Sequence, residues 1–219
     1  MKNTKYNTYP ILYSFRRCPY AIRARMALAY SNITIELKEI SLSNRPQELY
    51  HISTKGTVPV LSINNSTIID ESLDIMKWAL KQNDLDNWIS NNIEFQLEMI
   101  KVYDDEFKFW LDRYKYFDRF PEKNRVFYRS KCSEYLTKLN QLLECNKYLL
   151  TNKILFVDVA IVPFIRQCAN IDKLWFQETY SKLSDWLTYI IESKLFVSVM
   201  EKYLEYNDEL KPIITNFNE

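Results

Sequence analysis

The residue best suited by type and position to do chemistry is Cys18, in the sequence Arg-Arg-Cys-Pro at residues 16–19. The apolar run at residues 11–15 predicts a buried strand, and a proline at the first helical position predicts a helix from Pro19. The partial positive charge at a helix N-terminus stabilises a thiolate. Nearby cationic side chains are expected to act in the same direction: Arg16, Arg17, Arg23 and Arg25. We therefore predict that the pKa of the Cys18 thiol lies below that of a free cysteine. The alternative is a small buried cysteine that only packs.

The spacing of the cysteines separates this thiol from dithiol enzymes. The third residue after Cys18 is Ala21, so the C-x-x-C motif is absent and a redox cycle needs its second thiol from a small molecule. The other cysteines lie in helical patterns with apolar neighbours and are expected in the core: Cys132, Cys145 and Cys168. Their scattered spacing predicts neither a disulfide framework nor a zinc site, and it favours the reducing cytoplasm.

The elements that position Cys18 follow the order β-α-β-α-β-β-α within residues 1–82. Strands are expected at residues 11–15, 33–40, 58–63 and 67–70, and helices at residues 19–32, 44–53 and 71–80. A polar linker follows, and helical patterns then continue at about 88–118, 121–146, 154–171, 181–193 and 195–207. The sequence thus predicts a mixed α/β domain over residues 1–82 and an all-helical domain over residues 88–219.

Composition excludes several classes of function. The chain has 29 Lys and Arg against 28 Asp and Glu, and this net charge of +1 argues against nucleic acid as the main ligand. The single glycine, Gly56, cannot form a Gly-rich phosphate loop. No apolar stretch reaches the roughly 20 residues of a membrane helix, and the opening residues lack a signal peptide's apolar core, so no membrane partner is expected. No metal-ligand cluster is present, and the only histidine, His51, is expected to be exposed.

Four blocks of sequence, in matching order and spacing, resemble the cysteine-type glutathione transferases, the omega class especially. They are residues 13–21 (YSFRRCPYA), 42–46 (LSNRP), 56–61 (GTVPVL) and 70–72 (DES). Residues 158–163 (DVAIVP) resemble the buried Asp and Pro of a core helix in this family. Leu155 stands where the family has Ser or Thr, so a reciprocal capping box is not expected. The resemblance implies a thioredoxin-like first domain, glutathione as co-substrate and a homodimer.

The resemblance also implies a glutathione site. Val58 and Pro59 would form a cis peptide, with the Val58 backbone pairing with the cysteinyl unit of glutathione; otherwise Pro59 is an edge-strand proline. Glu71 would face the ammonium of the γ-glutamyl unit. Ser72 and the N–H groups at the helix start would face the carboxylate of the same unit. The alternative is that these residues only cap the helix. Arg45 would contact the glycyl carboxylate, or else it is a solvated surface charge.

These residues favour thiol transfer, in which Cys18 forms a mixed disulfide with glutathione and reduces or deglutathionylates small-molecule or protein substrates. The second substrate would be a small hydrophobic compound or a disulfide. One alternative is a conjugating transferase that uses the hydroxyl of Ser14 or Tyr13, and another is a non-enzymatic interaction module of the same fold. Four aromatic residues at helical spacing are expected in the core rather than in a substrate pocket: Tyr103, Phe107, Trp110 and Tyr114.

Overall fold

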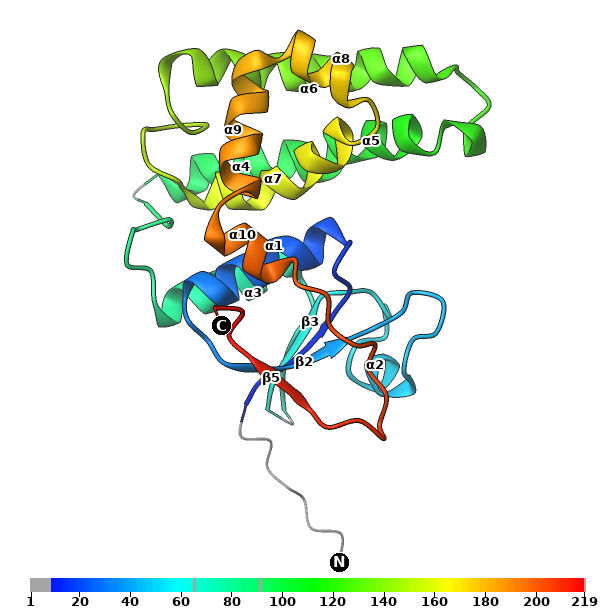
Figure 1. Cartoon of the computed structure of the whole chain (residues 1–219), viewed down its shortest axis with the longest axis vertical. Helices are drawn as coiled ribbons and strands as arrows, with labels where there is room; N and C mark the ends of the chain where they lie inside the picture. The colour runs from blue at the N-terminus through cyan, green and yellow to red at the C-terminus, as the bar shows by residue number, and fades with distance from the viewer. Residues whose placement is uncertain (1–8, 65, 91, 219) are drawn as a thin grey trace, which may run out of the picture. The chain divides into compact units, whose positions relative to one another are not determined.

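The computed structural model describes residues 9–64, 66–90 and 92–218. These residues form two compact units (Figure 1). The first unit combines the described residues up to Leu85 with those from Lys194 onward, and the second comprises Asp86–Ser193.

The first unit is built on a mixed β-sheet with the strand order β4-β3-β1-β2-β5. β1 runs parallel to β2, and the other neighbouring strands are antiparallel. The elements up to α3 follow the predicted order β-α-β-α-β-β-α, which confirms the thioredoxin-like fold. Their bounds are β1 (Ile11–Ser14), α1 (Pro19–Tyr30), β2 (Ile35–Glu39), α2 (Gln47–Ile52), β3 (Val60–Asn64), β4 (Thr67–Ile69) and α3 (Ser72–Gln82), joined later by α10 (Lys194–Val199) and β5 (Ile213–Thr215).

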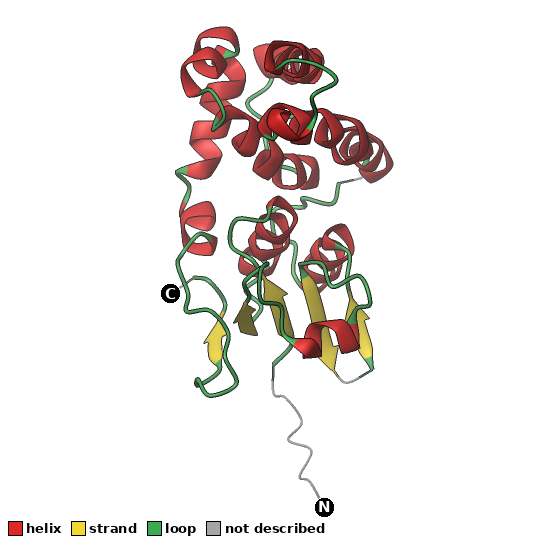
Figure 2. Ribbon diagram, turned by 90° about the vertical axis from the view of Figure 1, so that its right-hand side faces the viewer, coloured by secondary structure: helices red, strands yellow, loops and turns green. Residues whose placement is uncertain are grey.

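Figure 2 shows the strands of this sheet in yellow. Apolar residues on the central strands hold its register. Leu12 of β1 lies opposite Leu37 of β2 and Leu61 of β3, and all three side chains are buried. α1 is buried along nearly its whole length because it packs against both α3 and α10. Burial of this central layer supplies the hydrophobic stabilisation of the unit and fixes the start of α1, where Cys18 lies.

The end of the chain differs from the expected all-helical domain over residues 88–219. α10 ends at Val199 rather than near residue 207, and β5 pairs antiparallel with the edge of β2, with Leu37 opposite Ile213. The side chains of Arg25 and Arg16 donate hydrogen bonds to the carbonyls of Val199 and Met200 at 3.2 Å. The last carbonyls of a helix have no intrahelical donor, and the two arginines supply donors at this helix end.

The second unit is helical, as predicted for residues 88–193. α4, a π-helical turn η1 and α5 form one continuous helical stretch. The bounds are α4 (Ile93–Val102), η1 (Tyr103–Phe107), α5 (Lys108–Lys115), a 3₁₀ turn η2 (Phe117–Arg119), α6 (Arg125–Cys145), α7 (Phe156–Ala169), α8 (Lys173–Thr179) and α9 (Ser181–Ile191).

Asp158 organises the centre of this unit from the first turn of α7. Its fully buried carboxylate accepts hydrogen bonds from the backbone N–H groups of Leu149 and Leu155, both at 2.9 Å, and from the indole N–H of Trp186 at 3.0 Å. The bond from Leu155 is one half of a capping box. The other half needs a side-chain acceptor at the cap, which leucine lacks, as the sequence predicted.

Candidate glutathione site

Cys18 is the N-cap residue of α1, directly before Pro19, as the sequence predicted. Its backbone is extended (φ −75°, ψ 123°), and its N–H donates to the carbonyl of Phe15 at 2.9 Å. The thiol is half-buried and packs beside apolar residues of β1 and β3. The Cys18 Sγ lies 3.6 Å from the carbonyl oxygen of Val58, to which the thiol donates. The thiol therefore lies at a helix N-terminus with part of its surface accessible.

The peptide bond between Val58 and Pro59 is cis, as the resemblance implied. It precedes β3 directly and follows a turn that contains Gly56, whose φ is +59°. A Cβ atom at this position would collide with the ring of Tyr50, so both the backbone angle and the close approach require glycine. The turn places the Val58 carbonyl against Cys18.

Glu71 and Ser72 lie at the start of α3, as expected. Ser72 is buried, and its hydroxyl accepts a hydrogen bond from Nε of Arg23 at 3.0 Å. Glu71 is exposed and forms an ion pair with Lys55, which also lies 3.5 Å from Asp70. The hydrogen bond that Lys55 donates to Glu71 raises the pKa of Lys55. This lysine was not predicted from the sequence. It pairs with the Glu71 carboxylate, which was expected to face the ammonium of glutathione.

Arg45 lies in the irregular segment before α2 and is half-buried. Its Nε atom is buried, and it has no hydrogen-bond partner within the described part of the chain. A buried donor without an acceptor is costly, and an anionic ligand would satisfy it. Among the predicted site residues, the structure brings Cys18 together with Val58, and it joins Ser72 to Arg23.

Two of the arginines that were expected to favour the thiolate, Arg16 and Arg25, have other partners. Arg25 is fully buried, and its guanidinium donates to the Ser14 hydroxyl at 2.7 Å and forms an ion pair with Glu39. Burial lowers the pKa of Arg25, and the Glu39 carboxylate acts in the opposite direction. The backbone N–H of Arg16 also donates to Glu39, at 2.6 Å. Because Glu39 neutralises Arg25, the effect of this arginine on Cys18 is reduced.

Both hydroxyls considered as alternatives to Cys18 are buried and hydrogen-bonded to other side chains. Ser14 is 0% exposed and accepts from Arg25. Tyr13 is 4% exposed, and its hydroxyl donates to Glu48 at 3.0 Å. Burial, followed by the charge of Glu48, raises the pKa of Tyr13. A hydroxyl held in this way is poorly placed to activate a bound thiol.

The other cysteines and the four aromatic residues lie outside this site. Cys132 and Cys168 are buried, and their mutual hydrogen bond together with burial raises the pKa of Cys168. Cys145 is exposed, so the expectation of a core position is wrong: it is the last residue of α6, beyond Leu143, the last buried position of that helix. The expected core positions are confirmed for Tyr103, Phe107 and Tyr114, whereas Trp110 is half-buried. His51 is exposed, as expected.

In the part of the chain that the structure describes, no three His, Cys, Asp or Glu side chains are grouped so that they could hold a metal ion. None of the helices described here combines the length and the apolar character needed to cross a membrane.

Comparison with known proteins finds a similarity between part of the first unit and glutathione transferases. Residues 12–87 match the family described as the glutathione S-transferase N-terminal domain. Glutathione S-transferase omega-2 of Homo sapiens is 37% identical over 62 residues, which are 28% of this chain and 26% of that protein. Omega-1 of Rattus norvegicus is likewise 37% identical over 62 residues, with the same coverage. The matched part thus spans about a quarter of the length of these curated relatives.

Solved structures extend the likeness to both units. A glutathione transferase family member from Pseudomonas fluorescens, with two glutathione bound, has a TM-score of 0.75 at 14% identity and covers 88% of this chain and 92% of its own. A glutathione transferase from Phanerochaete chrysosporium in complex with oxidized glutathione has a TM-score of 0.76 at 17% identity, covering 88% of this chain and 95% of its own. The chain therefore has the fold of the glutathione transferases, and its residues 12–87 match their N-terminal domain.

Proposed function

We propose that this chain is a glutathione transferase of the cysteine, omega-like type, which transfers thiols through Cys18. The observation that carries the proposal is the position of the Cys18 thiol, half-exposed at the N-terminus of α1 and 3.6 Å from the carbonyl oxygen of Val58. A helix N-terminus stabilises the thiolate, which is the nucleophilic form. The partial similarity to omega-class proteins supports the same reaction.

The proposed reaction consists of two thiol–disulfide exchanges. In the first, the Cys18 thiolate attacks the glutathione sulfur of a mixed disulfide between glutathione and a substrate thiol. A bond forms between Cys18 and glutathione, and the substrate leaves as a thiolate that takes a proton from water. In the second, the thiolate of another glutathione attacks this bond, which releases glutathione disulfide and restores the Cys18 thiolate. In the net reaction, the mixed disulfide and one reduced glutathione become the substrate thiol and glutathione disulfide, so one reduced glutathione is oxidised per cycle.

Four further residues and one backbone segment would bind glutathione in this proposal. The backbone of Val58, beside the cis Pro59, would pair with the cysteinyl unit. The hydroxyl of Ser72 and the N–H groups of α3 would bind the γ-glutamyl carboxylate, with Glu71 facing the ammonium. Arg45 would bind the glycyl carboxylate, for which its unpaired buried Nε is suited.

Conjugation through a hydroxyl is the weaker candidate because Ser14 and Tyr13 are both buried and hydrogen-bonded to other side chains. The proposed cycle consumes reduced glutathione, so we place it in a reducing compartment such as the cytoplasm. A homodimer, which light scattering tests directly, is part of the proposal. The second substrate, a small hydrophobic compound or a disulfide, is to be found by screening.

The test is formation of the mixed disulfide itself. The protein is incubated with oxidised glutathione and its intact mass is measured, with Cys18→Ala in parallel. The matched control is Cys145→Ala, which removes the exposed cysteine at the end of α6. We expect a single glutathione adduct, on Cys18, that persists in Cys145→Ala, disappears in Cys18→Ala and is reversed by reduced glutathione.

Other outcomes would contradict the proposal. An adduct on Cys145 alone would indicate that only an ordinary surface thiol reacts. Conjugation of an aryl halide to glutathione at full rate in Cys18→Ala would favour the hydroxyl mechanism. The absence of both adduct and glutathione binding would favour a non-enzymatic module.

A further inference from the structure

The residues between α10 and β5 form a segment, residues 200–212, that crosses the edge of the first unit at β2; we refer to it as the C-terminal segment. The backbone N–H of Tyr206 donates to the carbonyl of Glu39 on β2 at 2.6 Å. Its side chain enters a polar group composed of Tyr13, Lys38, Glu48 and Tyr206, here called the Lys38 cluster. The segment therefore contacts α2, to which Glu48 belongs, although more than 150 residues separate them in sequence.

Lys38 is the centre of this cluster. Its ammonium donates to Glu48 at 2.6 Å and to the hydroxyl of Tyr206 at 2.9 Å. It also lies 4.2 Å from the centroid of the Tyr206 ring, a cation–π distance. The hydroxyl of Tyr206 lies 3.4 Å from both oxygens of Glu48 and contacts Asp208 more closely. Because that hydroxyl has a single proton, its link to Glu48 runs mainly through the ammonium of Lys38.

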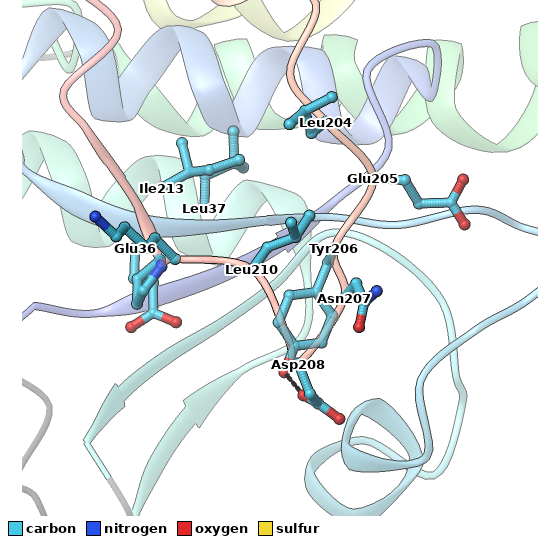
Figure 3. Close-up of a pocket in the computed structure, with 11 residues that line it drawn as sticks. Glu36, Leu37, Leu204, Glu205, Tyr206, Asn207, Asp208, Leu210 and Ile213 are labelled. Atoms are coloured by element: carbon cyan, nitrogen blue, oxygen red, sulfur yellow. Dashed lines mark hydrogen bonds between the residues drawn. The ribbon is translucent and has the colours of Figure 1, made fainter.

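The C-terminal segment has little apolar packing beneath it. A cavity of about 430 Å³ separates it from Glu36 and Leu37 of β2 (Figure 3). Leu204 is 70% exposed and Leu210 is 47% exposed, so neither side chain anchors the segment. The polar contacts of Tyr206 are therefore an important part of its attachment to the sheet.

α2 depends on the same contacts. It is six residues long, has no side-chain cap, and contributes Leu49 to the core as its only buried residue. A helix this short has little stability of its own. Burial acts to raise the pKa of Glu48, but the hydrogen bonds from Lys38 and Tyr13 outweigh it and the pKa is lowered. The net direction agrees with an ionised Glu48 that fastens α2 to the strands.

Arg45 lies two residues before α2, so the position of this helix sets where its guanidinium points. We propose that the C-terminal segment controls the affinity for the glycyl end of glutathione: Tyr206, through Lys38 and Glu48, holds α2 so that Arg45 meets the glycyl carboxylate. Tyr206 is thus a positioning residue, and the inference rests on the proposed glutathione site. Loosening the cluster weakens the contact with that carboxylate and leaves Cys18 unchanged.

The test compares two tyrosines of the C-terminal segment. Tyr206→Phe removes the hydroxyl that accepts from Lys38, whereas Tyr203→Phe removes a hydroxyl that contacts Thr215 and Glu201 instead of α2. The dissociation constants of reduced glutathione and of its glycyl ethyl ester are measured by calorimetry. We expect Tyr206→Phe to weaken binding of glutathione about threefold or more, with little effect on the ester, and Tyr203→Phe to change neither. Glu48→Gln, which acts on the same link, is expected to have a larger effect.

The ester separates a positioning role from a general loss of structure, because a generally loosened site weakens both ligands equally. The inference is overturned if Tyr206→Phe weakens binding of glutathione and of the ester equally. It is also overturned if Tyr206→Phe and Glu48→Gln both leave the affinity for glutathione unchanged. In either case, binding of glutathione by the wild type still supports the proposed function. If the wild-type chain binds neither ligand, the proposed function itself fails. The rate of Cys18 alkylation at fixed pH is measured alongside, and it is expected to be the same in all variants.

Discussion

The buried carboxylate of Asp158 is expected to make the free energy of unfolding of the second unit depend on pH. The side chain is 0% exposed and accepts three hydrogen bonds. Burial raises its pKa from 3.8 to about 6, although the bonds from Leu149, Leu155 and Trp186 act in the opposite direction. Folding therefore favours the protonated form of this group.

The direction of the pH dependence is set by the number of protons that the folded and the unfolded chain bind. Between pH 3.8 and about 6, the carboxyl is ionised in the unfolded chain and still protonated in the folded one. The folded state binds more protons there, so stability falls as pH rises. The contribution is fully present below pH 3.8 and is lost as pH passes about 6. A shift of about two pKa units corresponds to about 3 kcal/mol, of which roughly 2 kcal/mol disappear between about pH 4.5 and about pH 7.

Asp158→Asn removes the titration. Its amide has only one acceptor oxygen, so it leaves a buried donor without a partner at every pH, at a cost of about 1–3 kcal/mol. Urea unfolding followed by tryptophan fluorescence gives the stability of both proteins. We expect the advantage of the wild type over the variant to shrink by about 2 kcal/mol from about pH 4.5 to about pH 7. The control is Asp185→Asn, which changes an exposed carboxylate on α9.

A constant difference between wild type and Asp158→Asn across this range would refute the reasoning, because it would mean that the pKa of Asp158 is not raised. A difference that grows with pH would show the opposite shift, with the three donors outweighing burial.

Periodicity in the sequence predicted most elements up to residue 193, although it missed the short helix α8 (Lys173–Thr179). β4 has only three residues, but it was predictable because a turn joins it directly to β3. β5 could not be predicted this way: it has three residues, Ile213–Thr215, and its partner is the edge of β2, fixed more than 170 residues earlier. The end of α10 also lies against distant residues, since the carbonyls of Val199 and Met200 accept from Arg25 and Arg16. Both features depend on tertiary contacts that leave no local signal.

The candidate site was predictable where a local motif describes it and not where the groups meet in space. Cys18 at a helix start and the cis peptide before Pro59 followed from short motifs. The partners of Arg23 and Arg25 did not follow from a short motif, although the spacing of these two arginines was informative. Residues two apart on a helix point about 200° apart, so these arginines could not both face one thiol. Two charges within an otherwise apolar helix indicate buried partners, which are here Ser72 for Arg23, and Ser14 with Glu39 for Arg25.

Two further predictions concern ion pairs in the first unit. Glu39→Gln leaves the fully buried Arg25 without its counter-charge and is expected to destabilise the protein by about 3–5 kcal/mol in urea unfolding, whereas Glu36→Gln on the same strand should cost under about 1 kcal/mol. Equal effects would mean that Arg25 is solvated in solution. Lys55→Met frees the exposed Glu71 carboxylate, for which Lys55 competes with the ammonium of glutathione, so calorimetry should show about twofold tighter binding of glutathione at low salt. The gain should vanish at high salt because this pair is exposed and therefore screened. Weaker binding would instead indicate that Lys55 itself contacts a carboxylate of glutathione, and the role proposed for Glu71 would be wrong.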